Sequence, residues 1–129
     1  MVKDFMSWHI AKGKIDKTVK EIYFKEREIW WCSLGLNVGY EQDGKDEDFS
    51  RPVLILKQFN LYLFWALPLT TAKKEGKHYF SFEFGDNVEK SSVILSQIRL
   101  LDSKRLLRKM GMMGVDDFKK TKNLIKEYL

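Results

Sequence analysis

The sequence has only one cysteine, two histidines and two prolines among 129 residues. The single cysteine, Cys32, excludes an internal disulfide and a cysteine-based zinc site, because each needs more than one sulfur atom. We interpret Cys32 as a small buried side chain of a strand, with a reactive thiol as the alternative. His9 and His78 lie far apart in the sequence, so only the fold could assemble them into an acid–base pair. A glycine-rich phosphate loop and a GxSxG nucleophile motif are also missing.

Long hydrophobic runs are missing as well. The most apolar stretch, LYLFWALPL at 61–69, is interrupted by Pro68 and is shorter than the roughly 20 residues of a membrane span. The first residues, MVKDFMSW, carry charges where a signal peptide needs an apolar segment. We therefore expect a cytoplasmic protein that has no membrane partner.

Charge is unevenly distributed along the chain. The net charge is +5 and the calculated pI is about 9.2. Basic residues are frequent from Arg99 onward, whereas five carboxylates lie between Glu41 and Asp48. A basic protein attracts phosphate chains and releases their counterions, so polyanionic partners are favoured. The acidic segment would repel the same partner locally.

The acidic segment does not have the pattern of a metal site. Its carboxylates do not follow the spacing of an EF-hand, and nothing in the sequence supplies the rest of a cation cage. We expect a flexible, solvated loop that holds no metal, and a protein that uses no cofactor. The carboxylates in question are those of Asp43, Asp46, Glu47 and Asp48.

Hydrophobic spacing predicts a helix near each end of the chain and strands between them. Residues 4–23 carry an apolar stripe of helical spacing with Asp4 as N-cap, and residues 114–129 carry another with Asp116 as candidate cap. Five segments between them are rich in β-branched and aromatic residues, as is typical of strands. They lie at 28–34, 52–58, 61–69, 78–84 and 91–102, and the last ends in a short turn. This pattern predicts a small barrel or sandwich, with an N-terminal helical extension over 1–27 and the barrel with its final helix over 28–129.

Polar residues follow the predicted strands in a recognisable order. GYEQDG precedes RPVLIL, LPLTT comes next, and SSVILSQIRLLDSKRL closes the series. In this order and at these separations, the segments resemble the PemK/MazF-like family of toxin endoribonucleases of type II toxin–antitoxin systems. The resemblance runs from Glu28 to Leu107 and continues more weakly through the final helix.

The resemblance implies a fold, partners and a reaction. The fold is a mainly β, SH3-like small barrel with flanking helices, and it forms a homodimer. Single-stranded RNA binds at the dimer interface, a cognate antitoxin neutralises the toxin, and DNA is contacted only indirectly through an antitoxin complex. The implied reaction needs no metal: the ribose 2'-OH attacks the adjacent phosphate, which leaves a 2',3'-cyclic phosphate and a 5'-OH.

The resemblance also implies roles for individual residues. Arg51 matches the arginine before proline, and its planar, permanently charged guanidinium suits the charge that grows on phosphate oxygens. Thr70 matches the threonine that ends the third strand, and Glu41 is either a proton acceptor or the residue that orients Arg51. An ion pair of Arg51 with Asp48 or Glu47, and a plain turn role for Thr70, remain alternatives. The expected substrate-binding residues are Gln42, Thr71, Ser96, Gln97 and Arg99.

Three departures from the family pattern stand out. The segment DGKDEDFS lengthens the loop before Arg51 and makes it acidic. Ser96 stands where some members carry an acidic residue with a proton-transfer role, which leaves Glu41 as the expected acceptor. The N-terminal helix lies outside the family pattern. Two other functions are therefore kept: a noncatalytic RNA- or antitoxin-binding module of the same fold, and a gyrase-targeting toxin of the CcdB type.

Overall fold

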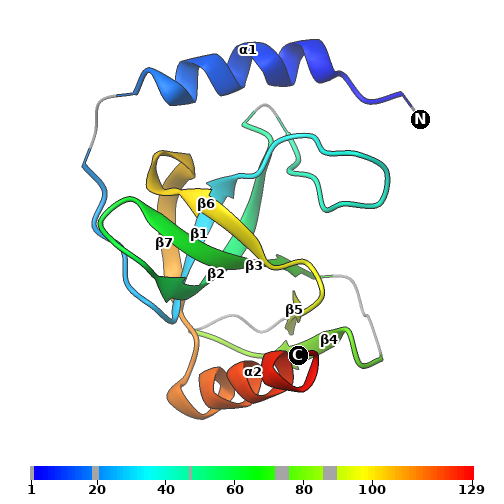
Figure 1. Ribbon diagram of the computed structural model, residues 1–129, viewed down its shortest axis with the longest axis vertical. Helices are drawn as coiled ribbons and strands as arrows, with labels where there is room; N and C mark the ends of the chain where they lie inside the picture. Colours follow the sequence, from blue (N-terminus) through cyan, green and yellow to red (C-terminus); the bar gives the residue numbers. More distant parts are fainter. Residues whose placement is uncertain (1, 19–20, 47, 72–75, 86–89) are drawn as a thin grey trace.

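The computed structural model describes residues 2–18, 21–46, 48–71, 76–85 and 90–129. Seven strands form one antiparallel sheet, and Figure 1 shows a helix at each end of it. The strand order is β4-β5-β3-β2-β1-β7, and β6 pairs with β3 beside this path. The elements are α1 (Phe5–Asp16), β1 (Glu28–Ser33), β2 (Ser50–Gln58), β3 (Leu63–Thr70), β4 (Tyr79–Phe82), β5 (Ser91–Ile94), β6 (Arg99–Asp102), the 3₁₀ helix η1 (Ser103–Arg105), β7 (Leu106–Met112) and α2 (Val115–Glu127).

The sheet is curled but not closed. Register shifts interrupt the β1–β7 and β2–β3 pairings, and such irregularities bend strands and increase their twist. No pairing joins β4 to β7 within the described residues. The prediction of a mainly β fold with flanking helices is confirmed, and the predicted barrel takes the form of an open, curled sheet.

The central strand β2 is buried on both faces, which explains its continuous apolar run. Val53 and Ile55 face one hydrophobic cluster, and Leu54 and Leu56 face the other. Cys32 lies fully buried in the first of these clusters, and burial raises the pKa of its thiol to about 12. The interpretation of Cys32 as a buried strand residue is confirmed, and its thiol is not in a reactive environment.

The N-terminal helix is shorter than predicted. The Asp4 carboxylate caps α1 by accepting from the Ser7 backbone N–H at 3.0 Å, as expected, but the helix ends at Asp16 instead of continuing to residue 23. Trp8 is the only buried side chain of α1. Residues 19 and 20 lie outside the described part, and Phe24 beyond them packs in the core against Phe64, with ring centroids 5.0 Å apart. This packing needs a chain that has left the helix.

The C-terminal half differs from the prediction at three points. The single strand predicted over 91–102 is divided into β5 and β6, because a turn at residues 95 and 96 separates them. Gly114, not Asp116, is the N-cap residue of α2, and Asp116 lies in the first helical turn, where its negative charge complements the helix dipole. Strand β7 was not predicted. Its sequence, LLRKMGM, lies mostly exposed and therefore lacks the alternating pattern of a half-buried strand. No helix of the described residues is both long enough and apolar enough to cross a membrane.

Candidate functional site

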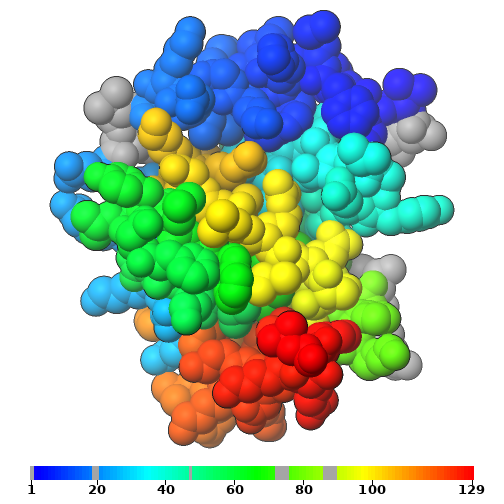
Figure 2. Space-filling model, viewed as in Figure 1, coloured from blue at the N-terminus to red at the C-terminus, as the bar shows by residue number. Residues whose placement is uncertain are grey.

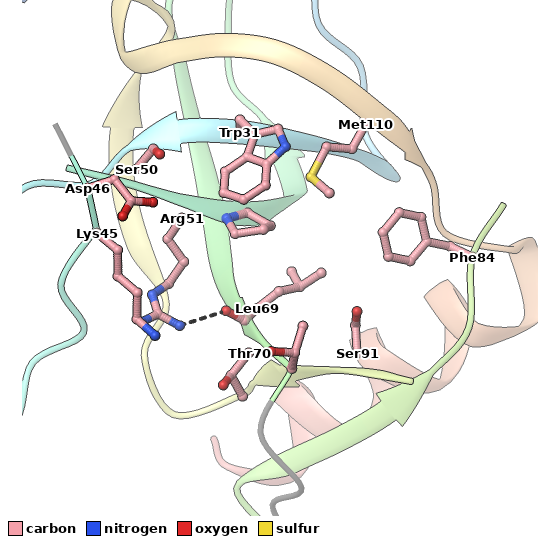
Figure 3. Close-up of a pocket in the computed structure, with 12 residues that line it drawn as sticks. Trp31, Lys45, Asp46, Ser50, Arg51, Leu69, Thr70, Phe84, Ser91 and Met110 are labelled. Atoms are coloured by element: carbon pink, nitrogen blue, oxygen red, sulfur yellow. Dashed lines mark hydrogen bonds between the residues drawn. The ribbon is translucent and has the colours of Figure 1, made fainter. Parts of the chain in front are cut away.

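Arg51 lies at the start of β2, in the wall of a pocket of about 210 Å³. Pairing between β1 and β2 places Trp31 opposite Pro52, and both residues line the pocket beside Arg51. Figure 3 shows the guanidinium reaching past the β2 backbone toward the end of β3. The lining residues are Trp31, Lys45, Asp46, Ser50, Arg51, Pro52, Leu69, Thr70, Thr71, Phe84, Ser91 and Met110.

Protein oxygens hold the Arg51 guanidinium in place. Its Nε donates to the Asp43 carbonyl at 2.7 Å and its Nη1 to the Leu69 carbonyl at 3.0 Å. The Gln42 side-chain oxygen, with the amide turned toward the guanidinium, accepts from Nε at 3.1 Å and from Nη2 at 2.7 Å. Each terminal nitrogen carries two N–H groups, so these bonds use half of the terminal donors. The other half of the terminal N–H groups can donate to the oxygens of a phosphate.

Arg51 is a buried cation rather than a surface one. It is 8% exposed, and burial lowers the pKa of its guanidinium while the nearby Asp43 carboxylate acts in the opposite direction. Within the described part of the chain no ion pair joins Arg51 to Asp48, and Glu47 lies outside that part. An arginine stays protonated even when its pKa is lowered, so the pocket contains a fixed positive charge in surroundings of low dielectric.

Thr70 and Thr71 line the same pocket as Arg51. The β2–β3 register pairs Val53 with Pro68, which brings the first residues of β2 beside the last residues of β3. Thr70 is half-buried and pairs with Ser92 of β5, whereas Thr71 is exposed just beyond the strand. The strand pairing therefore brings Arg51 and the two threonines to the same pocket.

The acidic loop before β2 also contributes to this pocket. Lys45 and Asp46 line it, next to Arg51 in Figure 3, because the loop folds back through a bridge between Lys45 and Ser50. Backbone hydrogen bonds join Lys45 to Ser50 in both directions and Gly44 N–H to the Gly35 carbonyl, and they arrange the described residues of this loop. Gly44 is essential to this turn, since a Cβ atom there would lie 1.5 Å from the Phe49 carbonyl oxygen. Sequence reasoning missed Lys45 and Asp46 because only this turn brings them to the pocket.

A second pocket, of about 440 Å³, holds most of the other predicted site residues. Glu41 lines this second pocket and not the pocket of Arg51. Its carboxylate accepts from the Val38 backbone N–H at 2.8 Å. Arg99 Nη1 donates to the Leu34 carbonyl at 3.3 Å. Burial lowers the pKa of the Arg99 guanidinium, and repulsion by Arg105 lowers it further. The lining residues are Asn37, Tyr40, Glu41, Ser96, Gln97, Ile98 and Arg99.

Gln42 connects the two pockets. Its side-chain oxygen faces Arg51, and its backbone N–H donates to Gln97 Oε1 at 2.6 Å. Gln97 in turn donates from Nε2 to the Tyr40 carbonyl at 3.2 Å. The predicted residues therefore form two groups, with the arginine and threonines on one side of Gln42 and Glu41, Ser96, Gln97 and Arg99 on the other.

Comparison with known proteins gives a family and a fold for this chain. The family described as "PemK-like, MazF-like toxin of type II toxin-antitoxin system" matches residues 25–129. The fold resembles that of the Mycobacterium tuberculosis toxin MazF-mt6, at 20% identity and a TM-score of 0.60 over 78% of this chain and 94% of that one. No match was found among curated proteins.

Two further solved structures share the fold. One is MazF from Deinococcus radiodurans, at 18% identity and a TM-score of 0.64, with 83% of this chain and 97% of that chain covered. The other is an endoribonuclease in complex with its cognate antitoxin from a mycobacterial species, at 15% identity and a TM-score of 0.60, with 81% and 93% covered. At these identities the likeness is one of fold.

Proposed function

The chain belongs to the PemK-like, MazF-like toxin family of type II toxin–antitoxin systems, and we propose on that basis that it is a sequence-specific endoribonuclease that cuts single-stranded RNA without a metal ion. The observation that carries the proposal is the buried Arg51 guanidinium, held by three oxygen acceptors in the wall of the pocket that Thr70 also lines. A fixed cation of this kind stabilises charge that develops on a phosphate during reaction.

The proposed reaction is an internal transfer within the RNA. The 2'-oxygen bonds to the adjacent phosphorus, the bond from phosphorus to the 5'-oxygen of the next nucleotide breaks, and that oxygen takes up a proton. Arg51 donates to the nonbridging oxygens, whose charge grows as the new bond forms. The Thr70 hydroxyl, beside it in the pocket, holds a nonbridging oxygen or the 2'-OH. The products are a 2',3'-cyclic phosphate and a 5'-OH.

Two carboxylates compete for the role of proton acceptor. Glu41 is the acceptor that the family resemblance implies, but it lines the second pocket. Asp46 lines the pocket with Arg51 and is the acceptor that the geometry favours. Removal of a general base typically lowers the rate by about 100-fold or more and removes the rate increase with pH that its deprotonation causes. The pH–rate profiles of Asp46→Asn and Glu41→Gln, measured side by side, identify the acceptor as the carboxylate whose loss flattens the acidic limb.

The remaining predicted residues form the path for the rest of the substrate. We assign Thr71 to the scissile pocket, and Gln42, Ser96, Gln97 and Arg99 to the nucleotides that follow into the second pocket. The proposed unit is a cytoplasmic homodimer that a cognate antitoxin neutralises, with DNA contacted only through the antitoxin complex. One of the solved relatives is a toxin bound to its cognate antitoxin, which supports this partner. We propose an N-terminal extension over 1–27 and a family domain over 28–129, and the family match begins close to this boundary, at residue 25.

The noncatalytic binding module remains the second candidate. Arg51 is 8% exposed, and the acidic loop contributes Lys45 and Asp46 to its pocket, so the loop narrows access to the guanidinium. A protein of this kind would bind RNA or antitoxin without turnover.

One experiment decides between these functions. Purified protein is incubated with a long single-stranded RNA in EDTA, with Arg51→Ala beside it, and the new ends are mapped. The proposal expects discrete cuts that carry 2',3'-cyclic phosphate and that the variant does not make. RNA that stays intact but is bound by the folded wild type would favour the binding module.

A further inference from the structure

The segment that precedes the family match is attached to the loop that holds Arg51. In Figure 2 the N-terminal residues, in dark blue, pack directly against the loop residues in cyan. Trp8 is the centre of this contact: it is buried, and its ring lies 5.3 Å from the Phe49 ring. Gly35 completes the socket, because a Cβ atom at that position would come within 2.2 Å of the Trp8 ring. Helix α1 is therefore seated against Gly35 and Phe49, and we call the described residues between them, 35–46 and 48–49, the Arg51 loop.

Lys3 binds the Arg51 loop at three oxygen atoms. Its Nζ pairs with Asp43 Oδ2 at 2.8 Å and donates to the carbonyls of Asn37 and Gly39 at 2.6 Å and 3.1 Å. The ion pair is partly shielded from solvent, with about a quarter of each side chain exposed. A flexible lysine on a solvated surface seldom collects three ligands, since each costs side-chain entropy. The arrangement fixes Lys3 to one part of the loop.

Asp43 transmits this contact to Arg51. Its carboxylate binds Lys3 on one oxygen and accepts from the Asn37 backbone N–H on the other, at 2.6 Å. Its carbonyl oxygen accepts from Arg51 Nε at 2.7 Å. Two successive contacts at one residue therefore link the N-terminal segment to the guanidinium. The neighbouring Gly44 N–H donates to the Gly35 carbonyl at 2.7 Å and closes the same loop over Trp8.

We propose that Lys3 is a positioning residue, through which the N-terminal extension holds the Arg51 loop in the conformation that orients Arg51. The effect on RNA cleavage rests on the proposed function, whereas the effect on the loop does not. A single ion pair that is partly exposed contributes little to global stability, so we expect the contact to act locally. A small displacement of a group that stabilises the transition state lowers the rate without a matching loss of substrate affinity.

Lys3→Met tests the proposal, and Lys12→Met is its matched control. Both changes remove one positive charge, and Lys12 lies exposed on helix α1, which follows Lys3 in the chain. In Lys3→Met, amide exchange at Asn37 and Gly44 becomes severalfold faster, while the melting temperature and the exchange of β2 stay at the control's values. The single-turnover rate at saturating RNA falls about 10-fold with unchanged RNA affinity. Lys3→Arg, which keeps the charge, restores the amide exchange and the cleavage rate. Asp43→Asn, which removes the other partner of the ion pair, causes the same changes as Lys3→Met.

The outcomes separate this inference from the proposed function. If the wild type cuts no RNA, the proposed function fails, and the exchange measurements still decide whether Lys3 holds the loop. Exchange and cleavage in Lys3→Met that match Lys12→Met would overturn the inference. A Lys3→Met protein that unfolds globally, or one whose Lys3→Arg counterpart stays defective, would also overturn it, because the contact would then be structural for the whole fold.

Discussion

Arg51 and Arg99 lie in neighbouring pockets, and burial lowers the pKa of both guanidinium groups. Their surroundings differ in charge. Asp43 attracts Arg51 and opposes the effect of burial. Arg105 repels Arg99 and adds to the effect of burial, with Glu41 as a smaller opposing influence. Arg51 is held by two carbonyls and an amide oxygen, and the one protein bond described for Arg99 is the long contact to Leu34.

This difference assigns different tasks to the two arginines. A guanidinium fixed among neutral oxygens is preorganised to meet charge that appears only during reaction. A guanidinium beside a second cation gains most from an anion that is already charged in the ground state, such as an RNA phosphate. We therefore expect Arg51 to govern the rate of cleavage and Arg99 to govern affinity.

The largest expected effect comes from Arg51→Ala. Loss of a preorganised donor lowers turnover by about 100- to 1000-fold, and here the RNA affinity should change far less. Single-turnover cleavage of a short fluorescent RNA measures both quantities. Arg51→Lys, which keeps the charge but loses the planar fork, should remain strongly impaired. Lys120→Ala on α2 is the control for loss of one positive charge, and circular dichroism checks the fold.

Gln42→Met should give the next largest effect, because this residue joins the two pockets. Methionine has a similar length but cannot accept from the Arg51 guanidinium. We expect the saturated rate to fall by about 10-fold, since Arg51 loses one of its acceptors and shifts slightly. A change confined to KM would contradict the idea that Gln42 acts on Arg51.

Arg99→Ala should weaken binding and leave the saturated rate unchanged. The loss of a charged contact worth about 1 kcal/mol corresponds to a roughly fivefold higher KM. The salt dependence of binding should fall as well, by about 0.7 in the log–log slope for one phosphate contact on a single strand. Binding isotherms at several salt concentrations give both values. If Arg99→Ala lowered the saturated rate as much as Arg51→Ala, the division of tasks would be wrong.

The smallest effect is the one expected on RNA affinity, as distinct from the rate of cleavage, when carboxylates near the Arg51 pocket are removed. The double variant Asp46→Asn/Asp48→Asn should bind RNA about threefold more tightly at low salt, and screening should remove the difference at high salt. Asp116→Asn/Asp117→Asn on α2, at the opposite end of the molecule from α1 in Figure 1, is the matched control. Equal affinity of the two double variants would place the acidic loop away from the RNA.

The sequence predicts the Arg51 pocket better than the second pocket for a physical reason. Arg51 and Thr70 lie at the ends of two strands that are adjacent in sequence, so antiparallel pairing alone brings them together. Asn37 and Lys3 are 34 residues apart, and Gln42 and Gln97 are 55 residues apart. Contacts of that range depend on the loop conformation, which strand patterns do not encode. The position of Glu41 was not predictable for this reason.

The other missed features have local causes. Strand β7 is mostly exposed, so its side chains do not alternate between apolar and polar. Helix α1 was predicted too long because Ile22 fits the helical spacing, although it packs against the core beyond the end of the helix. The link from Lys3 to the Arg51 loop has no counterpart in any sequence pattern that we recognised.

The most direct test of the account is the structure of the protein bound to an RNA that lacks the attacking 2'-OH and therefore stays uncut. The account predicts that nonbridging oxygens of the scissile phosphate lie at about 2.8 Å from the Arg51 terminal nitrogens. It also predicts that the following nucleotide occupies the pocket of Gln97 and Arg99. A scissile phosphate bound at Arg99, with no RNA at Arg51 and Thr70, would contradict the account.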